Sequence, residues 1–219
     1  MPVGIIPPRG PFRAASETAA GEGNDGPNTA MDPGQVMMEG QLYRQAMRHC
    51  AGAVALVTVG RDAGRRTGLT VTAVCSLSDN PPSLLVCVNR KASAHPRIRE
   101  ERSFAVNFLG EQHLALALTF SGQKGVDGDE RFAFGDWTKL ATGTPVLQDA
   151  VAAFDCDLGE VIETGTHAVF VGTVRAATCD AVVSPLVYLR SAFHGIRSMH
   201  EVFSLGDIEA RKLSWADFS

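Results

Sequence analysis

Hydroxyl side chains alternate with apolar ones in the segment Gly68 to Ser76, where Thr70 and Thr72 flank Val71 and Ala73 follows. Because side chains of a β-strand point alternately to its two faces, both threonines lie on one face. Hydroxyl and backbone N–H groups there can donate hydrogen bonds to a polar ligand. The pattern also fits plain cross-strand pairing of threonines in an ordinary sheet.

A second polar segment, Asn89 to His95, carries Arg90, Lys91 and Ser93 directly after an apolar run. Guanidinium, ammonium and hydroxyl groups are donors suited to phosphate oxygens. We expect Arg90 and Ser93 to make such contacts, whereas Lys91 fits a solvated turn. Taken alone, a polar loop of this kind is also typical of an ordinary surface turn.

The chain lacks several common catalytic and binding motifs in the sequence context that each requires. No G-x-G-x-x-G follows an apolar run, so a dinucleotide would not be held as in a Rossmann fold. No G-x-S-x-G elbow marks a serine nucleophile. The five cysteines are widely spaced, without a C-x-x-C pair, and the six histidines are equally scattered. We therefore expect reduced thiols and no metal site.

The composition bounds the number of domains and the kinds of partner. With 219 residues, 45% of them apolar, the chain can bury one core but hardly two. Its net charge of −4 disfavours nucleic acid, whose binding proteins usually present a basic surface. No window approaches the roughly 20 apolar residues that span a bilayer, and the N-terminus lacks a secretory signal pattern. We expect a cytoplasmic protein that binds neither nucleic acid nor membranes.

The chain begins with a segment poor in large apolar side chains. Residues 1–36 are rich in Gly, Pro, Ala and Asn, a composition that predicts a disordered N-terminal tail. From about residue 39, Leu42, Ala46 and Cys50 recur at helical spacing. This spacing predicts a helix that ends near Gly52.

Short apolar runs bounded by turn residues dominate the rest of the chain. A second helical face lies within residues 111–120, and a long polar loop follows at 121–136. There is no β-α-β alternation, so an antiparallel barrel is favoured over a parallel sheet. The expected strands cover residues 53–59, 69–76, 84–89, 104–109, 151–162, 168–177 and 186–189.

Several motifs together resemble a known family. The stretch Gly68 to Pro82 reads G-L-T-V-T-A-V-C-S-L-S-D-N-P-P and is followed by an apolar strand and by the polar segment Asn89 to His95. Over about residues 40–196 the chain is similar to the flavin reductase-like, FMN-binding split-barrel family. The further motifs that carry the resemblance are Phe104-Ala-Val-Asn107, Arg131-Phe132, His167-Ala-Val-Phe-Val-Gly-Thr-Val174, Pro185-Leu-Val-Tyr188 and Phe193-His194-Gly195.

The resemblance implies both a fold and an activity. The fold would be mostly β, an antiparallel split β-barrel of Greek-key type with a few short peripheral helices, over residues 37–198, with a C-terminal extension at 199–219. The activity would be reduction of FMN or FAD by NADH, with NADPH as the alternative donor. Hydride transfer from the nicotinamide to the flavin requires close stacking and no side-chain nucleophile. Members of the family form homodimers and supply reduced flavin to a flavin-dependent monooxygenase, so we expect both partners.

The resemblance also assigns site residues. His167 would be the catalytic residue, beside the nicotinamide and the flavin, in a positioning role. Ala51, Ala73 and Phe193 depart from the family pattern, because each lacks a hydroxyl that the family often has at that position. The expected cofactor-binding residues are Thr70, Val71, Thr72, Ala73, Ser76, Asn89, Arg90, Ser93, His95, Phe104, Ala105, Arg131, Phe132 and Phe193, with Arg131 and Phe132 on a lid over the flavin.

Two other functions stay open. The same barrel suits a non-catalytic protein that holds flavin or haem for sensing or storage. An oxidase acting on a phosphorylated pyridoxine-like substrate shares the topology, but it needs a dense cluster of Arg and Lys around a second phosphate, which the sequence does not show. Oxidation of NADH with added flavin separates the reductase from the binding protein.

Overall fold

The computed structural model describes residues 33–180 and 183–196. The chain divides into two compact units, residues 1–41 and 42–219. Helix α1 covers Pro33–Met47, so it begins and ends earlier than the sequence predicts. Proline is favoured at the start of a helix, because its missing N–H has no partner there. The extension at 199–219 and the expected tail, apart from residues 33–36, lie outside the described residues.

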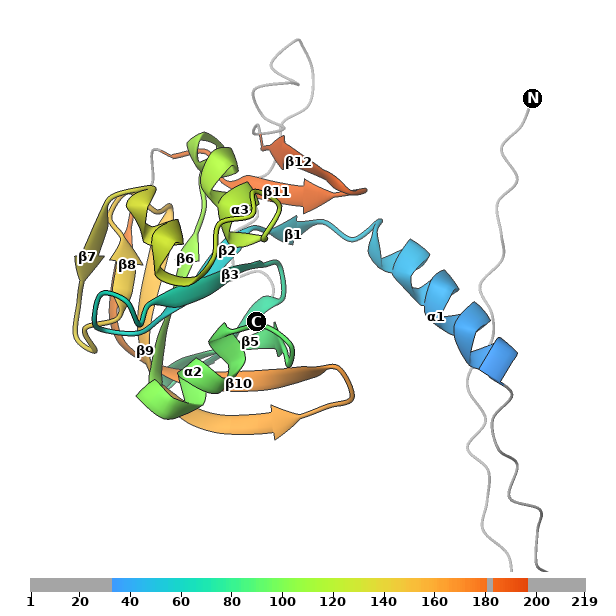
Figure 1. The fold of residues 1–219 in the computed structure, drawn as a ribbon, viewed down its shortest axis with the longest axis horizontal. Helices are drawn as coiled ribbons and strands as arrows, with labels where there is room; N and C mark the ends of the chain where they lie inside the picture. The colour runs from blue at the N-terminus through green and yellow to red at the C-terminus, as the bar shows by residue number, and fades with distance from the viewer. Residues whose placement is uncertain (1–32, 181–182, 197–219) are drawn as a thin grey trace, which may run out of the picture. The chain divides into compact units, whose positions relative to one another are not determined.

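The main element of the second unit is a seven-stranded antiparallel sheet in the order β3-β2-β6-β9-β10-β5-β4 (Figure 1). Its strands are β2 Ala55–Val59, β3 Thr67–Val71, β4 Val74–Asp79, β5 Pro82–Asn89, β6 Ser103–Phe108, β9 Ala152–Glu163 and β10 His167–Cys179. A three-stranded sheet joins β1 Gly52–Ala53, β11 Leu186–Leu189 and β12 Ala192–Gly195, and a two-stranded one joins β7 Trp137–Lys139 and β8 Pro145–Leu147.

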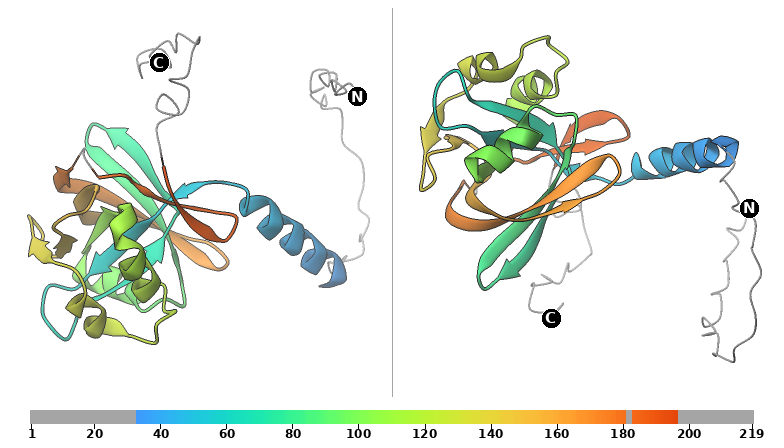
Figure 2. Two further views of the ribbon diagram at one scale, coloured as in Figure 1. Left: turned by 90° about the horizontal axis from the view of Figure 1, so that it is seen from above. Right: turned by 60° about the horizontal axis from the view of Figure 1, so that its bottom comes forward.

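Strands β3 and β4 lie at opposite edges of the seven-stranded sheet, yet only Thr72 and Ala73 separate them in the sequence. The sheet must therefore curl until its two edges approach each other at these residues, and Figure 2 shows the curled sheet from two further sides. The Ala73 carbonyl accepts a hydrogen bond from the N–H of Cys87 on β5 at 3.0 Å. Thr72 and Ala73 belong to no strand, so the barrel is split at this point.

The helices of the second unit are short. α2 covers Ala94–Glu101 and α3 covers Leu114–Phe120, with 3₁₀ turns η1 at Glu111–His113 and η2 at Gly128–Ala133. Helix α2 is absent from the expected elements, because it buries only two side chains, a stripe too narrow for the sequence pattern to reveal. Turn η2 lies within the expected long loop. The prediction of a mostly β, antiparallel fold with a few short helices is confirmed.

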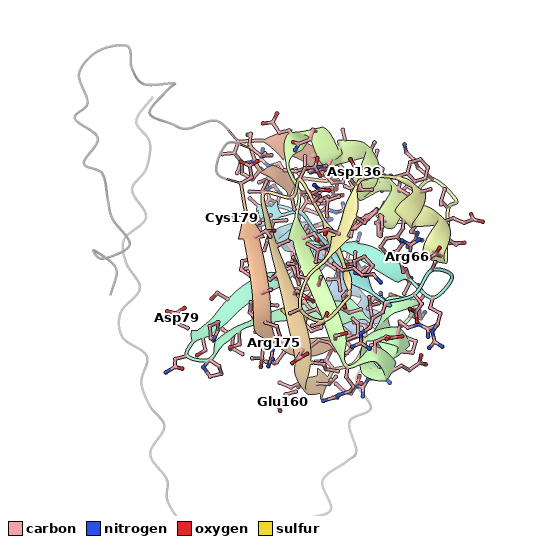
Figure 3. All side chains as sticks on the ribbon, turned by 90° about the vertical axis from the view of Figure 1, so that its left-hand side faces the viewer. Arg66, Asp79, Asp136, Glu160, Arg175 and Cys179 are labelled. Atoms are coloured by element: carbon pink, nitrogen blue, oxygen red, sulfur yellow. The ribbon has the colours of Figure 1, made fainter. Side chains whose placement is uncertain are left out.

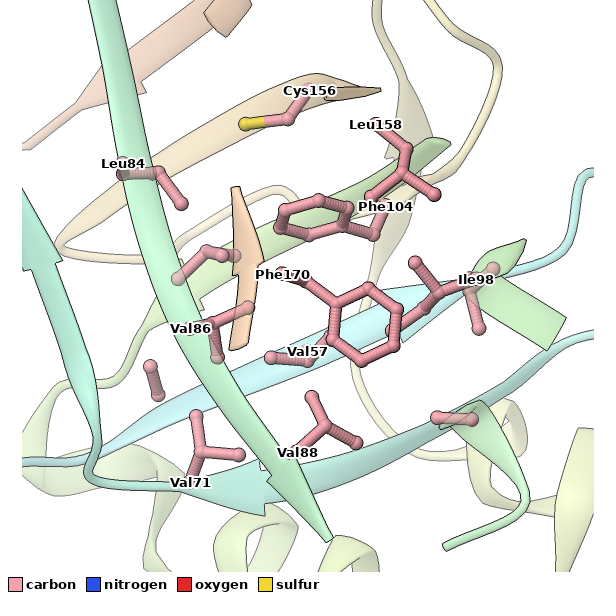
Figure 4. Packing of buried hydrophobic residues seen from close by; sticks show 14 of the residues in the cluster. Val57, Val71, Leu84, Val86, Val88, Ile98, Phe104, Cys156, Leu158 and Phe170 are labelled. Carbon is pink, nitrogen blue, oxygen red and sulfur yellow. The ribbon is translucent and has the colours of Figure 1, made fainter. Parts of the chain in front are cut away.

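Two apolar clusters fill the fold on the two sides of β2. Inside the curled sheet, Phe104 and Phe170 pack with Val57, as Figure 4 shows. Gly172 makes this packing possible, because a Cβ there would lie 2.6 Å from the Phe104 ring. On the outer side of the same strand, Leu56 packs in a second cluster with side chains of α3, η2 and β8. Burial on both faces explains why β2 is apolar except for Thr58, whose hydroxyl donates to the Pro145 carbonyl.

Candidate functional site

Two adjoining cavities open beside the split in the barrel and share Thr70 and Ser121. Their volumes are about 510 Å³ and about 200 Å³, and together they are named the split groove. The larger cavity is lined by Gly68, Leu69, Thr70, Asn89, Lys91, Ala92, Ser93, Phe120, Ser121, Asp127 and Arg131. The smaller cavity is lined by Val54, Thr70, Val71, Thr72, Ser121, Gln123, Tyr188 and Phe193.

A third cavity, of about 470 Å³, lies beside the β4–β5 hairpin and is named the apolar cavity. Phe108 and Phe154 line it, with their rings edge to face. Ser76, one of the expected cofactor contacts, lines this apolar cavity and therefore lies away from the split groove. Figure 3 shows Asp79, which lines the apolar cavity, on the opposite side of the barrel from Arg66, which is bonded to η2.

The loop after β5 brings an ammonium and a hydroxyl group to the larger cavity. The Asn89 carboxamide oxygen accepts a hydrogen bond from the Lys91 backbone N–H at 2.9 Å, which shapes the turn. The Ser93 hydroxyl lies 2.8 Å from the Thr67 hydroxyl of β3. Asn89, Lys91 and Ser93 all line the cavity, so the loop presents donors that suit a phosphate.

Arg90, the expected phosphate contact of this loop, points away from the split groove. Its Nε lies 3.4 Å from a carboxylate oxygen of Glu163, and its Nη1 donates to the Thr164 carbonyl at 3.3 Å. His95 also lies near Glu163, at 3.7 Å, with its ring edge-on to Phe170. Neither Arg90 nor His95 lines the groove, which runs against the interpretation of both as cofactor contacts.

Residues next to the split form one wall of the smaller cavity. Thr70, Val71 and Thr72 all line the smaller cavity. Thr72 lies beyond the end of β3, so strand alternation does not account for its position. The Thr70 hydroxyl donates to the Ala117 carbonyl at 2.7 Å, so its single proton is already used. Thr72 is exposed and packs against Gly52, where a Cβ would lie 2.9 Å from the Thr72 Cβ.

Arg131 lines the larger cavity, but its guanidinium is hydrogen-bonded to other parts of the protein. It is nearly buried, and each guanidinium nitrogen donates a hydrogen bond: Nε to the Val126 carbonyl at 2.7 Å, Nη1 to the Gly68 carbonyl at 2.8 Å, and Nη2 to the Asp127 carboxylate at 3.1 Å. These bonds fix the segment 121–127 to β3, so Arg131 positions the wall of the groove.

Turn η2 is anchored by an ion pair and by aromatic packing. Arg66 donates to both Asp129 carboxylate oxygens, at 2.6 and 3.0 Å, and its guanidinium lies over the Phe132 ring. The hydrogen bonds from Arg66 hold the pKa of Asp129 below its ordinary value, and the same bonds raise the pKa of Arg66. Phe132 packs against Phe120 and Trp137 in the second core cluster, so it is an anchor of the turn and lies outside the groove lining.

The β11–β12 hairpin supplies aromatic side chains to the smaller cavity. Tyr188 and Phe193 pair across the two strands, with ring centroids 5.0 Å apart. Sequence reasoning selected Phe193 and missed Tyr188. The signal that could have found Tyr188 is its place in the Pro185-Leu-Val-Tyr188 motif, one tight turn before Phe193.

Four other expected site residues do not line the split groove: Ala73, His167, Phe104 and Ala105. His167 starts β10, pairs with Asn89, and has its exposed ring 2.8 Å from the Thr166 hydroxyl. Phe104 and Ala105 are fully buried, on opposite sides of β6 in the two core clusters. The expectation that these two contact a cofactor is not supported, because their side chains pack the core.

The split groove offers different chemistry in its two cavities. The ammonium of Lys91 and the hydroxyl of Ser93 suit a phosphate in the larger cavity. In the smaller cavity, Tyr188 and Phe193 offer aromatic surface beside the Thr72 hydroxyl, a combination that suits a planar ring with a polar edge. A flavin mononucleotide has such a ring and such a phosphate, so this donor set fits it.

Within residues 33–180 and 183–196, no group of three or more His, Cys, Asp or Glu side chains is arranged to hold a metal ion. In the same residues, no helix has the length and apolar character needed to cross a membrane.

Comparison with known proteins identifies the family. Residues 47–197 match the flavin reductase like domain. The chain is 42% identical over 156 residues to the FMN reductase (NADH) RutF of Bradyrhizobium diazoefficiens, covering 71% of this chain and 85% of the relative. It is 45% identical over 146 residues to RutF 2 of Methylorubrum extorquens, covering 67% and 83%.

Solved structures agree with this match. BorF, the flavin reductase component of a bacterial two-component tryptophan halogenase, superposes with a TM-score of 0.67 at 30% identity, over 73% of this chain and 99% of BorF. The styrene monooxygenase flavin reductase SMOB of Pseudomonas putida superposes with a TM-score of 0.63 at 28% identity, over 71% and 97%. The predicted split-barrel architecture is therefore confirmed, and the chain belongs to the flavin reductase-like family of oxidoreductases.

Proposed function

We propose that the protein is an NADH-dependent FMN reductase that releases reduced FMN to a separate flavin-dependent oxygenase. The observation that carries this proposal is the split groove, which joins a cation and hydroxyls in one cavity to aromatic walls in the next. The names of the relatives, FMN reductase (NADH), support FMN and NADH over FAD and NADPH. BorF and SMOB, named as components of a halogenase and a monooxygenase, support a partner oxygenase.

The residues of the groove would bind and orient reactants. Bound flavin supplies the chemistry, because its ring accepts a hydride from the nicotinamide. Lys91 and Ser93 would hold the phosphate, and Tyr188 and Phe193 would flank the ring. The Thr72 hydroxyl would offset negative charge that develops on the ring during reduction. His167, on the strand next to Asn89, remains our candidate for orienting the nicotinamide.

The exposure of the groove supports exchange of flavin with solvent. Lys91, Thr72 and Gln123 are all exposed, although each lines one of the two cavities. A cofactor held at such a surface can leave after reduction, which delivery to another enzyme requires.

We also propose that the protein is a homodimer. Light scattering tests this by measuring the mass of the purified full chain.

Oxidation of NADH by the purified protein tests the proposed activity. We expect rapid loss of the nicotinamide absorbance with NADH and FMN, and slower loss when FAD replaces FMN or NADPH replaces NADH. Reduced FMN in the filtrate of the reaction, collected without oxygen, would show that it is released. Tight FMN binding without oxidation of either nicotinamide would overturn the reductase and leave a flavin-binding protein.

A further inference from the structure

Two of the four side-chain hydroxyl groups that line the smaller cavity already donate their proton within the protein. The Thr70 hydroxyl donates to the Ala117 carbonyl at 2.7 Å, and the Ser121 hydroxyl donates to the Leu118 carbonyl at 2.9 Å. Each hydroxyl has one proton, so both residues can only accept a hydrogen bond from a ligand. The donors left among the lining residues are the Thr72 hydroxyl, the Tyr188 phenol and the Gln123 carboxamide.

Gln123 differs from the other two because its carboxamide places an N–H donor and a carbonyl acceptor side by side in one plane. Within the part of the chain that the structure describes, this carboxamide makes no hydrogen bond. A planar pair of this kind matches a ring edge on which an N–H group adjoins a carbonyl. The pyrimidine part of a flavin has such an edge, with N3–H between the C2 and C4 carbonyls.

The backbone around Gln123 holds it beside the cavity. Gly122 and Gly125 have φ angles of +81° and +66°, a conformation that favours glycine, so they allow the tight path of this loop. The hydrogen bonds from Arg131 to Val126 and Gly68 tie the far end of the loop to β3. The loop is thus anchored on both sides of Gln123, since Ser121 is bonded to α3.

We propose that Gln123 is a specificity residue of the flavin site, whose carboxamide pairs with N3–H and a neighbouring carbonyl of the flavin ring. This inference rests on the proposed function. It assigns the smaller cavity to the pyrimidine edge of the ring and places the phosphate toward Lys91 in the larger cavity. The nicotinamide, whose carboxamide is also a planar donor and acceptor pair, is the competing partner for Gln123.

Replacement of Gln123 by leucine removes both hydrogen-bonding atoms at similar volume. We expect Gln123→Leu to raise the Kd for FMN by about tenfold, the effect of two ordinary hydrogen bonds at an exposed site. The KM for NADH should change by less than about twofold, because the carboxamide faces the flavin. Lys124→Leu is the matched control, since Lys124 neighbours Gln123 and is exposed but lines neither cavity.

A flavin analogue methylated at N3 sharpens the test, because it keeps the phosphate and the ring but lacks the N3–H donor. Quenching of flavin fluorescence gives the Kd of each pair. The wild-type protein should bind FMN several times more tightly than N3-methyl-FMN, and Gln123→Leu should bind the two with nearly equal affinity. Circular dichroism checks that each variant is folded.

Three other results of these titrations would overturn either the role of Gln123 or the proposed function. An FMN Kd unchanged by Gln123→Leu, together with a raised KM for NADH, would assign the residue to the nicotinamide and overturn the inference. Equal losses of affinity for FMN and N3-methyl-FMN would also overturn it, because the effect would then not depend on N3–H. A wild-type protein that binds neither flavin would instead overturn the proposed function itself.

Discussion

The larger cavity of the split groove and the apolar cavity differ little in size but strongly in chemistry. Their volumes are about 510 and 470 Å³. Lys91 and Ser93 line the first, whereas the second presents mainly apolar side chains, among them Phe108 and Phe154. A phosphate placed in the second would lose its hydration without gaining a cationic partner, and Asp79 in its lining would repel it, which is unfavourable. The side chains at the wall, and not the volume, decide which cavity suits a nucleotide.

The largest effect expected on the split groove is the loss of its exposed cation. Lys91→Ala should raise the Kd for FMN by about tenfold to a hundredfold, the range for a hydrogen bond to a charged group. The Kd for riboflavin should change by less than about threefold, because riboflavin has no phosphate. Fluorescence titrations at low and high salt measure both, and the effect on FMN should shrink as salt screens the charge.

Arg90→Ala is the matched control for this loop. It removes the neighbouring cation, which is bonded to Glu163 and Thr164 and does not line the groove. We expect a change of less than about threefold in the Kd for FMN. An effect as large as that of Lys91→Ala would show that Arg90 leaves Glu163 to meet the phosphate, and the resemblance-based choice of Arg90 would then be right.

An intermediate effect is expected from the ion pair that anchors η2 beside the groove. The hydrogen bonds from Arg66 lower the pKa of Asp129, so the pair stabilises the fold above the ordinary pKa of an aspartate. This contribution is lost as the pH falls through the lowered pKa of the folded state. Asp129→Asn should remove that acid-dependent part of the stability and speed FMN release by about threefold, as expected for a part-exposed pair.

Thermal unfolding between neutral and acidic pH and stopped-flow dilution of the FMN complex measure the two effects of Asp129→Asn. The wild-type and variant curves of stability against pH should converge in acid. If they stay parallel down to the acid limit, the ion pair does not anchor the turn.

The smallest effects are expected from the apolar cavity. Ser76→Ala should leave the Kd for FMN within about twofold, because Ser76 lines the apolar cavity and not the split groove. A tenfold loss of FMN affinity in this variant would mean that the cofactor reaches the apolar cavity, and the contrast between the two sites would fail.

Thiol chemistry gives a second test of the apolar cavity. Cys75 lines it and is exposed, whereas burial raises the pKa of the Cys156 thiol to about 12. At mildly alkaline pH a maleimide should therefore label Cys75 and spare Cys156, as mass spectrometry of tryptic peptides reveals. In a variant with Cys50, Cys87 and Cys179 replaced by serine, the labelled protein should keep its FMN affinity within about twofold.

Local patterns in the sequence predicted most of the longer strands, although the expected strand 69–76 is interrupted at Thr72 and Ala73 and the short strands β7, β8 and β12 were not predicted. The alternation of Thr70 and Thr72 with Val71 is a property of neighbouring residues, and all three line the smaller cavity. The buried run of β2 was equally evident, because a strand covered on both faces has few polar side chains. Such features depend on little beyond the segment itself.

Features set by distant parts of the chain could not be predicted in this way. The orientation of Arg90 depends on Glu163, which β9 brings near it from far along the sequence. The proposed contribution of Gln123 depends on a loop path that Arg131 fixes through one hydrogen bond to Val126 in the loop and one to Gly68 of β3. Phe104 belongs to a family motif, yet its ring is buried in the core, where it leaves no room for a Cβ at Gly172. A motif indicates where a residue matters but not which way its side chain points.

A crystal structure of the full chain with FMN would test the central claim, that the split groove is the flavin site, most directly. We predict the FMN phosphate within hydrogen-bond distance, about 3 Å, of the Lys91 ammonium and the Ser93 hydroxyl. The ring should lie in the smaller cavity between the β11–β12 hairpin and Thr72. Density for FMN in the apolar cavity, or a phosphate bound by Arg90 away from Lys91, would contradict the account.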